Sequence, residues 1–113
     1  MSRDVAGAHL ATTILLLEVS PSDQPALVDL ARGTQPIFAK QPGFVSGTLL
    51  TSADGTRLIQ VLQWRSAADG AACMRSADWA SEAGARFMAF IGAGKAAMEV
   101  VPCAVVSTSA STE

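Results

Sequence analysis

Two apolar strands around the dipeptide Asp54-Gly55 constrain this chain more than any other feature of its sequence. An Asp-Gly pair between alternating apolar residues is typical of a tight β-hairpin, because both residues accept a positive φ in the turn. The predicted strands span Gly43 to Ser52 and Thr56 to Arg65, and the chain enters the first through Pro42-Gly43. The second strand brings Trp64 to the start of a helix. We therefore expect the end of this hairpin to face a pocket.

The pattern before the hairpin predicts one strand and one helix. Residues His9 to Val19 are rich in Ile, Leu, Val and Thr, which indicates a strand buried on both faces. A helix is predicted to begin after Ser20, with Pro25 in its first turn. Gly33 and Pro36 both disfavour the interior of a helix. We therefore expect this helix to be in two pieces.

Capping signals place two more helices after the hairpin. Ser66 and Asp69 form a capping box at the start of a helix that runs to about Met74. Ser76 or Asp78 is predicted to cap the next helix. That helix should carry apolar side chains on the face that packs against the sheet, namely Trp79, Ala83, Phe87, Phe90 and Ile91.

The last predicted strand spans Ala96 to Ser107 and is dense in Val. Pro102 cannot donate a hydrogen bond to a neighbouring strand, so we expect it at a sheet edge or at a crossing point. In one interpretation, the segment after Pro102 leaves its own sheet and pairs with a partner chain.

The order strand, helix, strand, strand, helix, strand predicts an α+β fold of the ferredoxin-like split βαβ type, with an antiparallel sheet and helices on one face. Residues 1–8 are a predicted flexible N-terminus, 9–107 a single domain, and 108–113 a disordered tail. Half of the residues (50%) are hydrophobic and only 16% are charged. We therefore expect a second copy to cover the open face of the sheet in a two-fold homodimer.

Charge and hydropathy argue against several partners. The net charge is -2 and the Lys and Arg residues are scattered, so nucleic acid is not expected to bind. No segment reaches the roughly 20 apolar residues of a membrane span, and no signal-peptide cleavage pattern follows Leu10 to Leu17. We expect a cytoplasmic protein. Cys73 and Cys103 lack the spacing of a zinc site, and we expect free thiols, with a disulfide or reactive pair as the alternative.

The sequence Pro42-Gly43-Phe44, the hairpin turn and the strand end Gln63-Trp64-Arg65-Ser66 resemble the antibiotic biosynthesis monooxygenase family over most of the chain. The resemblance implies a dimeric α+β barrel. It also implies a cofactor-independent monooxygenase that oxidises an aromatic polyketide-like anthrone or phenol with dioxygen. In the family, a Trp at this strand end and an amide four residues earlier orient the substrate. Those positions are Trp64 and Gln60, where Asn is typical.

Strand alternation places Gln60, Leu62 and Trp64 on one face. If that face looks toward the helices, the amide and the indole N–H converge in an apolar cavity that suits a flat aromatic substrate. The alternative is that Trp64 only fills the core and Gln60 bonds to backbone. The predicted substrate-binding residues are Leu62, Phe38, Met74 and Phe87, with core packing as their alternative role.

The residues that would move a proton are less clearly marked. Quinone-forming members of the family carry a Tyr at about the place of Gly70, and this chain contains neither Tyr nor Asn. A proton acceptor or donor would have to come from His9, Glu82, Asp69 or Arg86. We take Arg86 as a candidate cation for a phenolate and His9 as a candidate base. The alternatives are a solvated Glu82–Arg86 pair and an exposed His9 at the strand end.

No cofactor is expected. Heme-degrading relatives supply an axial His from the helix after the Trp, but residues 67–92 contain no His, and Met74 or Met88 would be a poor substitute. Two functions remain: a cofactor-independent monooxygenase, or a non-catalytic dimeric module of the same fold that binds a hydrophobic small molecule.

Overall fold

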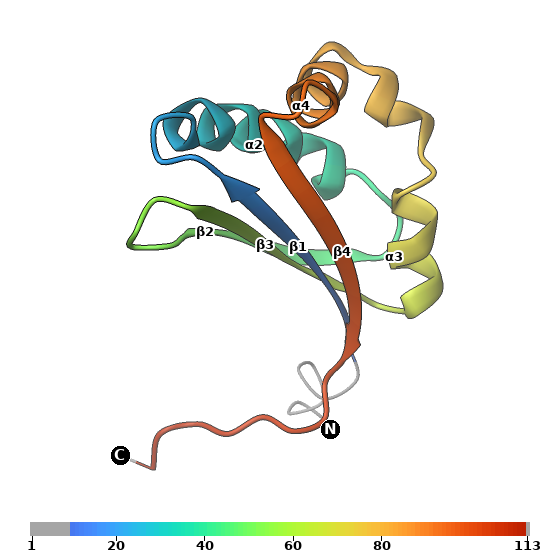
Figure 1. The fold of residues 1–113 in the computed structure, drawn as a ribbon. Coiled ribbons are helices and arrows are strands. Elements are labelled where there is room, and N and C mark those ends of the chain that lie inside the picture. The colour runs from blue at the N-terminus through green and yellow to red at the C-terminus, as the bar shows by residue number, and fades with distance from the viewer. Residues whose placement is uncertain (1–9, 113) are drawn as a thin grey trace.

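The computed structural model describes residues 10–112 and contains one four-stranded antiparallel sheet with strand order β2-β3-β1-β4. Helices lie on one side of this sheet, and the opposite face is bare (Figure 1). This is the predicted ferredoxin-like α+β fold. The elements in chain order are β1 (Ala11–Val19), α2 (Gln24–Ala39), β2 (Phe44–Thr51), β3 (Arg57–Trp64), α3 (Ala67–Cys73), the 3-10 turn η1 (Ala77–Ala80), α4 (Glu82–Gly92) and β4 (Ala96–Ala104).

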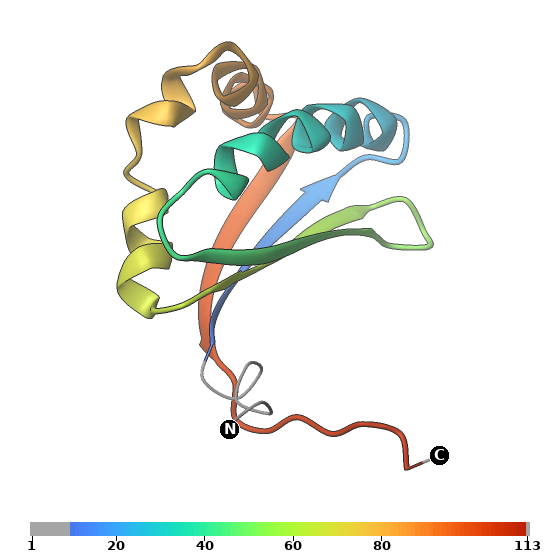
Figure 2. The same ribbon diagram turned by 180° about the vertical axis from the view of Figure 1, so that it is seen from behind.

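The two central strands, β1 and β3, supply about half of the buried core residues. Their register pairs Thr13 with Leu62 and Leu17 with Leu58, so these side chains lie in rows on the face toward the helices. Leu17 and Leu58 are fully buried there. Figure 2 shows the same arrangement from behind, with the helices above the concave side of the sheet. In β1 and β3, every second side chain therefore points into the buried layer between the sheet and the helices.

Strand β4 forms one edge of the sheet, so the prediction of an edge position for Pro102 is confirmed. Pro102 lies opposite Thr13, and the strand ends at Ala104, before the predicted end at Ser107. After Ala104 the chain runs away from the domain as an extended segment without further helix or strand up to residue 112 (Figure 1).

The prediction that the first helix is in two pieces is wrong, because α2 is continuous through Gly33 and Pro36. Its buried residues follow helical spacing along the whole length: Leu27, Ala31, Thr34, Ile37 and Phe38. Burial of this stripe outweighs the unfavourable propensity of the two residues. Thr34 is accommodated because its hydroxyl donates to the Ala31 carbonyl oxygen at 2.7 Å.

The hairpin turn differs in detail from the predicted one. Among residues 10–112 only glycines have a positive φ, so Gly55 adopts φ +80° while Asp54 does not. The carboxylate of Asp54 instead accepts hydrogen bonds from the hydroxyls of Ser52 and Thr56, both at 2.7 Å, and from the Thr56 N–H at 3.0 Å. These bonds, led by the one from the Thr56 hydroxyl, lower the pKa of Asp54 to about 2.

Serine residues cap all three segments after the hairpin. Ser66 begins α3 as predicted, with its Oγ accepting the Asp69 N–H at 3.1 Å. Ser76 caps only the short turn η1, which holds Trp79. The long helix α4 begins after Ser81, a cap that the sequence pattern did not single out. No helix in residues 10–112 has the length and hydropathy needed to cross a membrane.

The continuous helix α2 yields a stability prediction. Pro36 is exposed, so Pro36→Ala removes no packing and gives the Arg32 carbonyl a backbone donor. We expect the free energy of unfolding to rise by about 1–3 kcal/mol, measured by urea denaturation. Pro25→Ala is the matched control, because proline is tolerated in a first turn, and it should be neutral or lower stability by up to about 1 kcal/mol. A loss of stability in Pro36→Ala would contradict this account of the helix.

Candidate functional site

Trp64 ends strand β3 and is fully buried under α3. The edge of the Phe44 ring packs on it, with ring centroids 5.3 Å apart and planes at 76°. The backbone nearby is closed by a hydrogen bond from the Arg65 N–H to the Gly43 carbonyl oxygen at 2.8 Å. Gly43 has φ +79°, a conformation that favours glycine. The Pro-Gly-Phe sequence thus holds the Trp64 ring in place.

The indole N–H of Trp64 is buried and has no hydrogen-bond partner in the part of the chain that the structure describes. Helix α3 approaches it through Gly70, where a Cβ would lie only 3.1 Å from Nε1. The same Cβ would lie 3.2 Å from the hydroxyl of Thr13, which is itself buried. A buried donor without a partner costs about 1–3 kcal/mol, so this N–H is available to a ligand that carries an acceptor.

A small cavity of about 90 Å³ borders the Trp64 ring. Small side chains from α3 form one wall, and strands β1 and β4 form the other. The main lining residues are Thr13, Ala67, Gly70, Met74, Val100 and Pro102. This space accepts a projecting oxygen or a methyl-sized group, and it is too small for a fused ring system.

A larger hollow of about 470 Å³ lies beside this cavity, between α4, η1 and the β4 edge of the sheet. All its lining residues are apolar: Leu15, Met74, Trp79, Phe87, Met88, Met98 and Val100. Met74 and Val100 border both spaces, so the two are neighbours. A volume of this size and lining suits a flat aromatic molecule, and flexible Met side chains can adapt to its outline.

Trp79 is the anchor of the hollow. Its indole N–H donates to the Cys73 carbonyl oxygen at 2.9 Å, and its ring packs edge-on against Phe38 with centroids 5.2 Å apart. Its centroid is 6.3 Å from that of Phe87. In contrast to Trp64, Trp79 has no free donor to offer.

Gln60 faces the helices as predicted and is 1% exposed, but it lines a different pocket from Trp64. This pocket has a volume of about 140 Å³ and is lined by Gln35, Phe38, Ala39, Phe44, Gly47, Gln60 and Leu62. It shares no lining residue with the Trp64 cavity or the hollow. The two side chains are four residues apart along an extended strand, or about 13 Å. The expectation that their donors converge in one cavity is therefore wrong.

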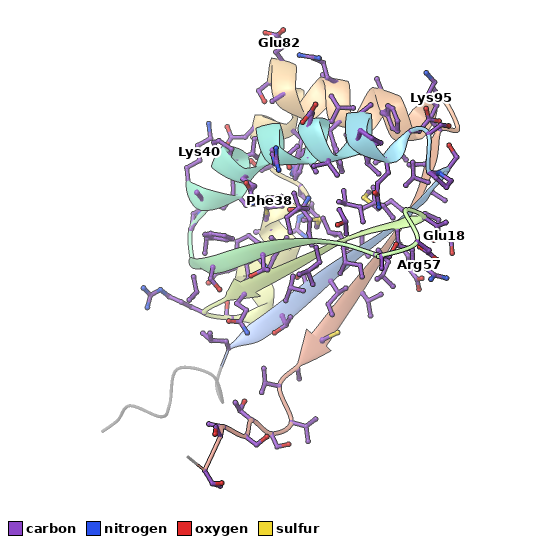
Figure 3. The ribbon with its side chains drawn as sticks, turned by 90° about the vertical axis from the view of Figure 1, so that its left-hand side faces the viewer. Glu18, Phe38, Lys40, Arg57, Glu82 and Lys95 are labelled. Carbon is purple, nitrogen blue, oxygen red and sulfur yellow. The ribbon has the colours of Figure 1, made fainter. Side chains whose placement is uncertain are left out.

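The predicted site residues thus fall into separate groups. Met74 and Phe87 join the hollow, with Met74 also at Trp64, whereas Phe38 and Leu62 join Gln60. Phe38 lies in the layer between α2 and the sheet (Figure 3). His9 lies outside the described residues.

Arg86 lines neither the Trp64 cavity, nor the hollow, nor the pocket beside Gln60. It is exposed and lines a groove of about 440 Å³ between α2 and α4, together with Asp29, Leu30 and Phe90. Phe87, one residue further along the helix, takes the position toward the sheet. Arg86 forms no ion pair with Glu82 within residues 10–112, where the ion pairs found are Arg32–Asp29 and Lys40–Asp78. Figure 3 shows Glu82 at the outer end of α4, far from the sheet.

Ionisable groups are scarce around Trp64. Within residues 10–112, the linings of its cavity and of the hollow contain no carboxylate, imidazole, ammonium or guanidinium group, and Cys103 is the one ionisable side chain found there. Cys103 and Cys73 are free thiols, as expected. Burial raises the pKa of Cys73 to about 11. Residues 10–112 hold no group of three or more side chains suited to a metal ion.

Several lining residues escaped the sequence analysis. Met98 and Val100 line the hollow because the register of β4 with β1 places them opposite Leu17 and Leu15. Their alternation along the last strand was the available signal. Thr13 lies in a strand that was predicted to be buried on both faces, and nothing in the sequence marks it as a neighbour of Trp64.

Fold and site together define a ferredoxin-like α+β domain with an apolar hollow and a buried indole donor between sheet and helices. No family model matches the chain. The tetracenomycin-F1 monooxygenase of Streptomyces glaucescens is 39% identical over 61 residues, which cover 53% of this chain and 54% of that protein. The chain thus matches about half the length of this curated relative.

Solved structures extend the similarity to most of the chain. A Nitrosomonas europaea protein provisionally named an antibiotic biosynthesis monooxygenase has a TM-score of 0.70 at 20% identity, covering 88% of this chain and 92% of its own. The cofactor-independent oxygenase SnoaB from Streptomyces nogalater has a TM-score of 0.63 at 20% identity, covering 89% and 97%. These structures share the fold. Together with the sequence match, they confirm the resemblance to the antibiotic biosynthesis monooxygenase family.

The unpaired carboxamide of Gln60 predicts a change in stability. Gln60→Met keeps the side-chain length and removes the buried donor, so we expect the free energy of unfolding to rise by about 1–2 kcal/mol. Urea denaturation of the ligand-free protein measures it. Gln63→Met, on the opposite face of the same strand, should change stability by less than about 0.5 kcal/mol. Destabilisation by Gln60→Met would mean that the carboxamide has a partner.

Proposed function

We propose that the protein is a cofactor-independent monooxygenase that oxidises an aromatic polyketide-like anthrone or phenol with dioxygen. The observation that carries the proposal is the unpaired, buried indole N–H of Trp64 beside an apolar hollow of about 470 Å³. The resemblance of the chain to a polyketide monooxygenase over half its length supports the same reaction class.

The proposed reaction requires few catalytic groups from the protein. An anthrone in its phenolate form passes an electron to dioxygen, the two radicals combine to a peroxide, and loss of water leaves a quinone. In sum, a CH₂ group and O₂ become a C=O group and H₂O. The site has to hold the anion, exclude water and stabilise negative charge on oxygen. A fixed N–H donor in an apolar surrounding does this.

In this proposal each group of residues has a defined task. Phe87, Met88 and Met98 hold the ring system in the hollow, and Met74 with Val100 forms the boundary to the Trp64 cavity. The substrate oxygen enters that cavity and accepts the hydrogen bond from Trp64 Nε1. Since no strong acid or base from residues 10–112 lines these spaces, the proposed proton acceptor is solvent, before or during entry of the substrate.

A specific observation also favours a second candidate, a non-catalytic module that binds a hydrophobic small molecule. Among residues 10–112, the linings of the spaces beside Trp64 contain no general base, and Arg86 lies in the groove between α2 and α4. Such a module would bind the same flat ligands through the same indole donor without consuming dioxygen.

We also propose that two copies pair through the open face of the sheet. Val61, Ile14 and Val101 form a row across three strands, and Ile59 with Leu16 forms the next row. All five are partly exposed, although they are large and apolar. A contiguous apolar patch of this kind on a sheet is typical of an interface between subunits.

Oxygen uptake with dithranol, an anthrone, tests the proposed reaction. Trp64→Phe keeps the ring and removes the donor, so we expect the enzyme-dependent rate to fall about 100-fold. Arg86→Gln should keep the wild-type rate, because Arg86 lies in the outer groove. Wild-type protein that binds dithranol but consumes no oxygen above the protein-free rate would favour the binding module instead.

The oligomeric state tests the proposed dimer. Ile14→Glu places a charge at the centre of the open face, and we expect it to convert a dimer to a monomer in size-exclusion chromatography with light scattering. Ala85→Glu, on the exposed side of α4, should leave the dimer intact. A wild-type monomer at micromolar concentration would rule out this pairing.

A further inference from the structure

The pocket beside Gln60 takes no part in the reaction proposed above, because it opens apart from the hollow and from Trp64. It lies between α2 and the β2–β3 hairpin. Phe38 and Phe44 supply aromatic walls, and Gly47 leaves space at the strand. Its features therefore need an explanation of their own.

The carboxamide of Gln60 is the polar feature buried in this pocket. Gln60 is 1% exposed, and its Nε2 is buried without a hydrogen-bond partner. Leu or Met would fill the same volume without leaving a donor unpaired, so a carboxamide here is costly unless something completes its bonds. A 180° flip of the side-chain amide lets Gln60 present either its NH₂ group as a donor or its carbonyl oxygen as an acceptor.

The lining restricts the charge and size of an occupant. None of the side chains is ionisable, so a charged ligand would lose its hydration without gaining a counter-ion. The volume of about 140 Å³ is close to that of an engineered cavity of about 150 Å³ that binds benzene. The pocket therefore has room for one aromatic ring, and the Phe38 and Phe44 rings suit contact with it.

We propose that this pocket is a second binding site, specific for a neutral single-ring aromatic compound that carries a carboxamide-like polar group. Gln60 pairs with the polar group, and Phe38 and Phe44 hold the ring. The site is separate from the hollow, so it binds its ligand whether or not the protein consumes oxygen.

The side-chain amides of the chain allow a direct test by ¹H–¹⁵N NMR. With no Asn present, the signals come from Gln24, Gln35, Gln41, Gln60 and Gln63 alone. Gln24 and Gln41 are internal controls, because their Nε2 atoms donate to the Arg57 carbonyl oxygen at 2.9 Å and to the Asp78 carboxylate at 2.8 Å. Loss of one pair of signals in Gln60→Met assigns Gln60.

Three ligands of similar shape test which ligand properties the pocket recognises. Benzamide is neutral and carries the polar group, benzoate is an anion, and toluene lacks the polar group. We expect benzamide to shift the Gln60 signals with a dissociation constant on the order of 1 mM, and the other two to bind at least about tenfold more weakly. Gln60→Met should weaken benzamide binding by a similar factor, measured from ligand line broadening. Gln63→Met, on the other strand face, should not.

A second variant tests the pocket while Gln60 itself is retained. In Gly47→Ala the new Cβ would lie 3.2 Å from Phe44 Cζ and 3.3 Å from Leu62 Cδ2, which narrows the pocket while keeping the Gln60 signals visible. We expect weaker benzamide binding in this variant too.

Each contrary outcome overturns the proposal. Equal binding of toluene and benzamide would mean that Gln60 does not recognise the polar group. Shifts confined to the ¹³C-methyl signals of Met88 and Met98 would place the ligand in the hollow. No Gln60 shift with any of the three compounds would mean that the pocket holds water alone.

Discussion

The alternation of side chains along β3 is the constraint on which the interior depends. Leu58, Gln60, Leu62 and Trp64 all point into the layer between sheet and helices, so two polar groups enter a space that is otherwise apolar. The strand register with β1 and β2 leaves them no other direction, because a shift by one residue would expose the whole row. Neither polar nitrogen finds a partner among residues 10–112.

Three buried side-chain polar atoms lack a partner among the described residues, the Thr12 hydroxyl and the two nitrogens of Gln60 and Trp64, and they reduce the stability of the protein. Each unpaired group costs about 1–3 kcal/mol, a considerable fraction of the 5–15 kcal/mol that stabilises a typical domain. Near Trp64, Gly70 and the Pro-Gly-Phe sequence hold the ring firmly without satisfying its N–H. Such a fixed, unsatisfied donor needs no rearrangement when an oxygen of a ligand arrives, which is the condition for effective stabilisation of developing charge.

Much of the fold follows from local sequence signals, because these act over few residues. The strand alternation, the Ser66 cap and the edge position of Pro102 were predicted from neighbours along the chain. The continuity of α2 was not, since burial of its stripe against the sheet and α4 overrides the local effect of Pro36. The start of α4 at Ser81 was missed because several serines compete as caps in that segment.

The site was less predictable, because cavities depend on how elements meet. Sequence spacing placed Gln60 and Trp64 on one face, but the two side chains line different pockets. Arg86 and Phe87 are adjacent in sequence and point about 100° apart around α4, so Arg86 faces the groove toward α2 and Phe87 faces the hollow.

The most direct measurement of the central claim is a crystal structure of the protein with a bound anthraquinone, which has the shape of the proposed product and does not react further. The account predicts flat density in the hollow between α4 and β4, with one ligand oxygen about 3 Å from Trp64 Nε1. A hollow closed by Met74, Met88 and Met98, or a ligand whose oxygens lie away from the indole, would contradict it.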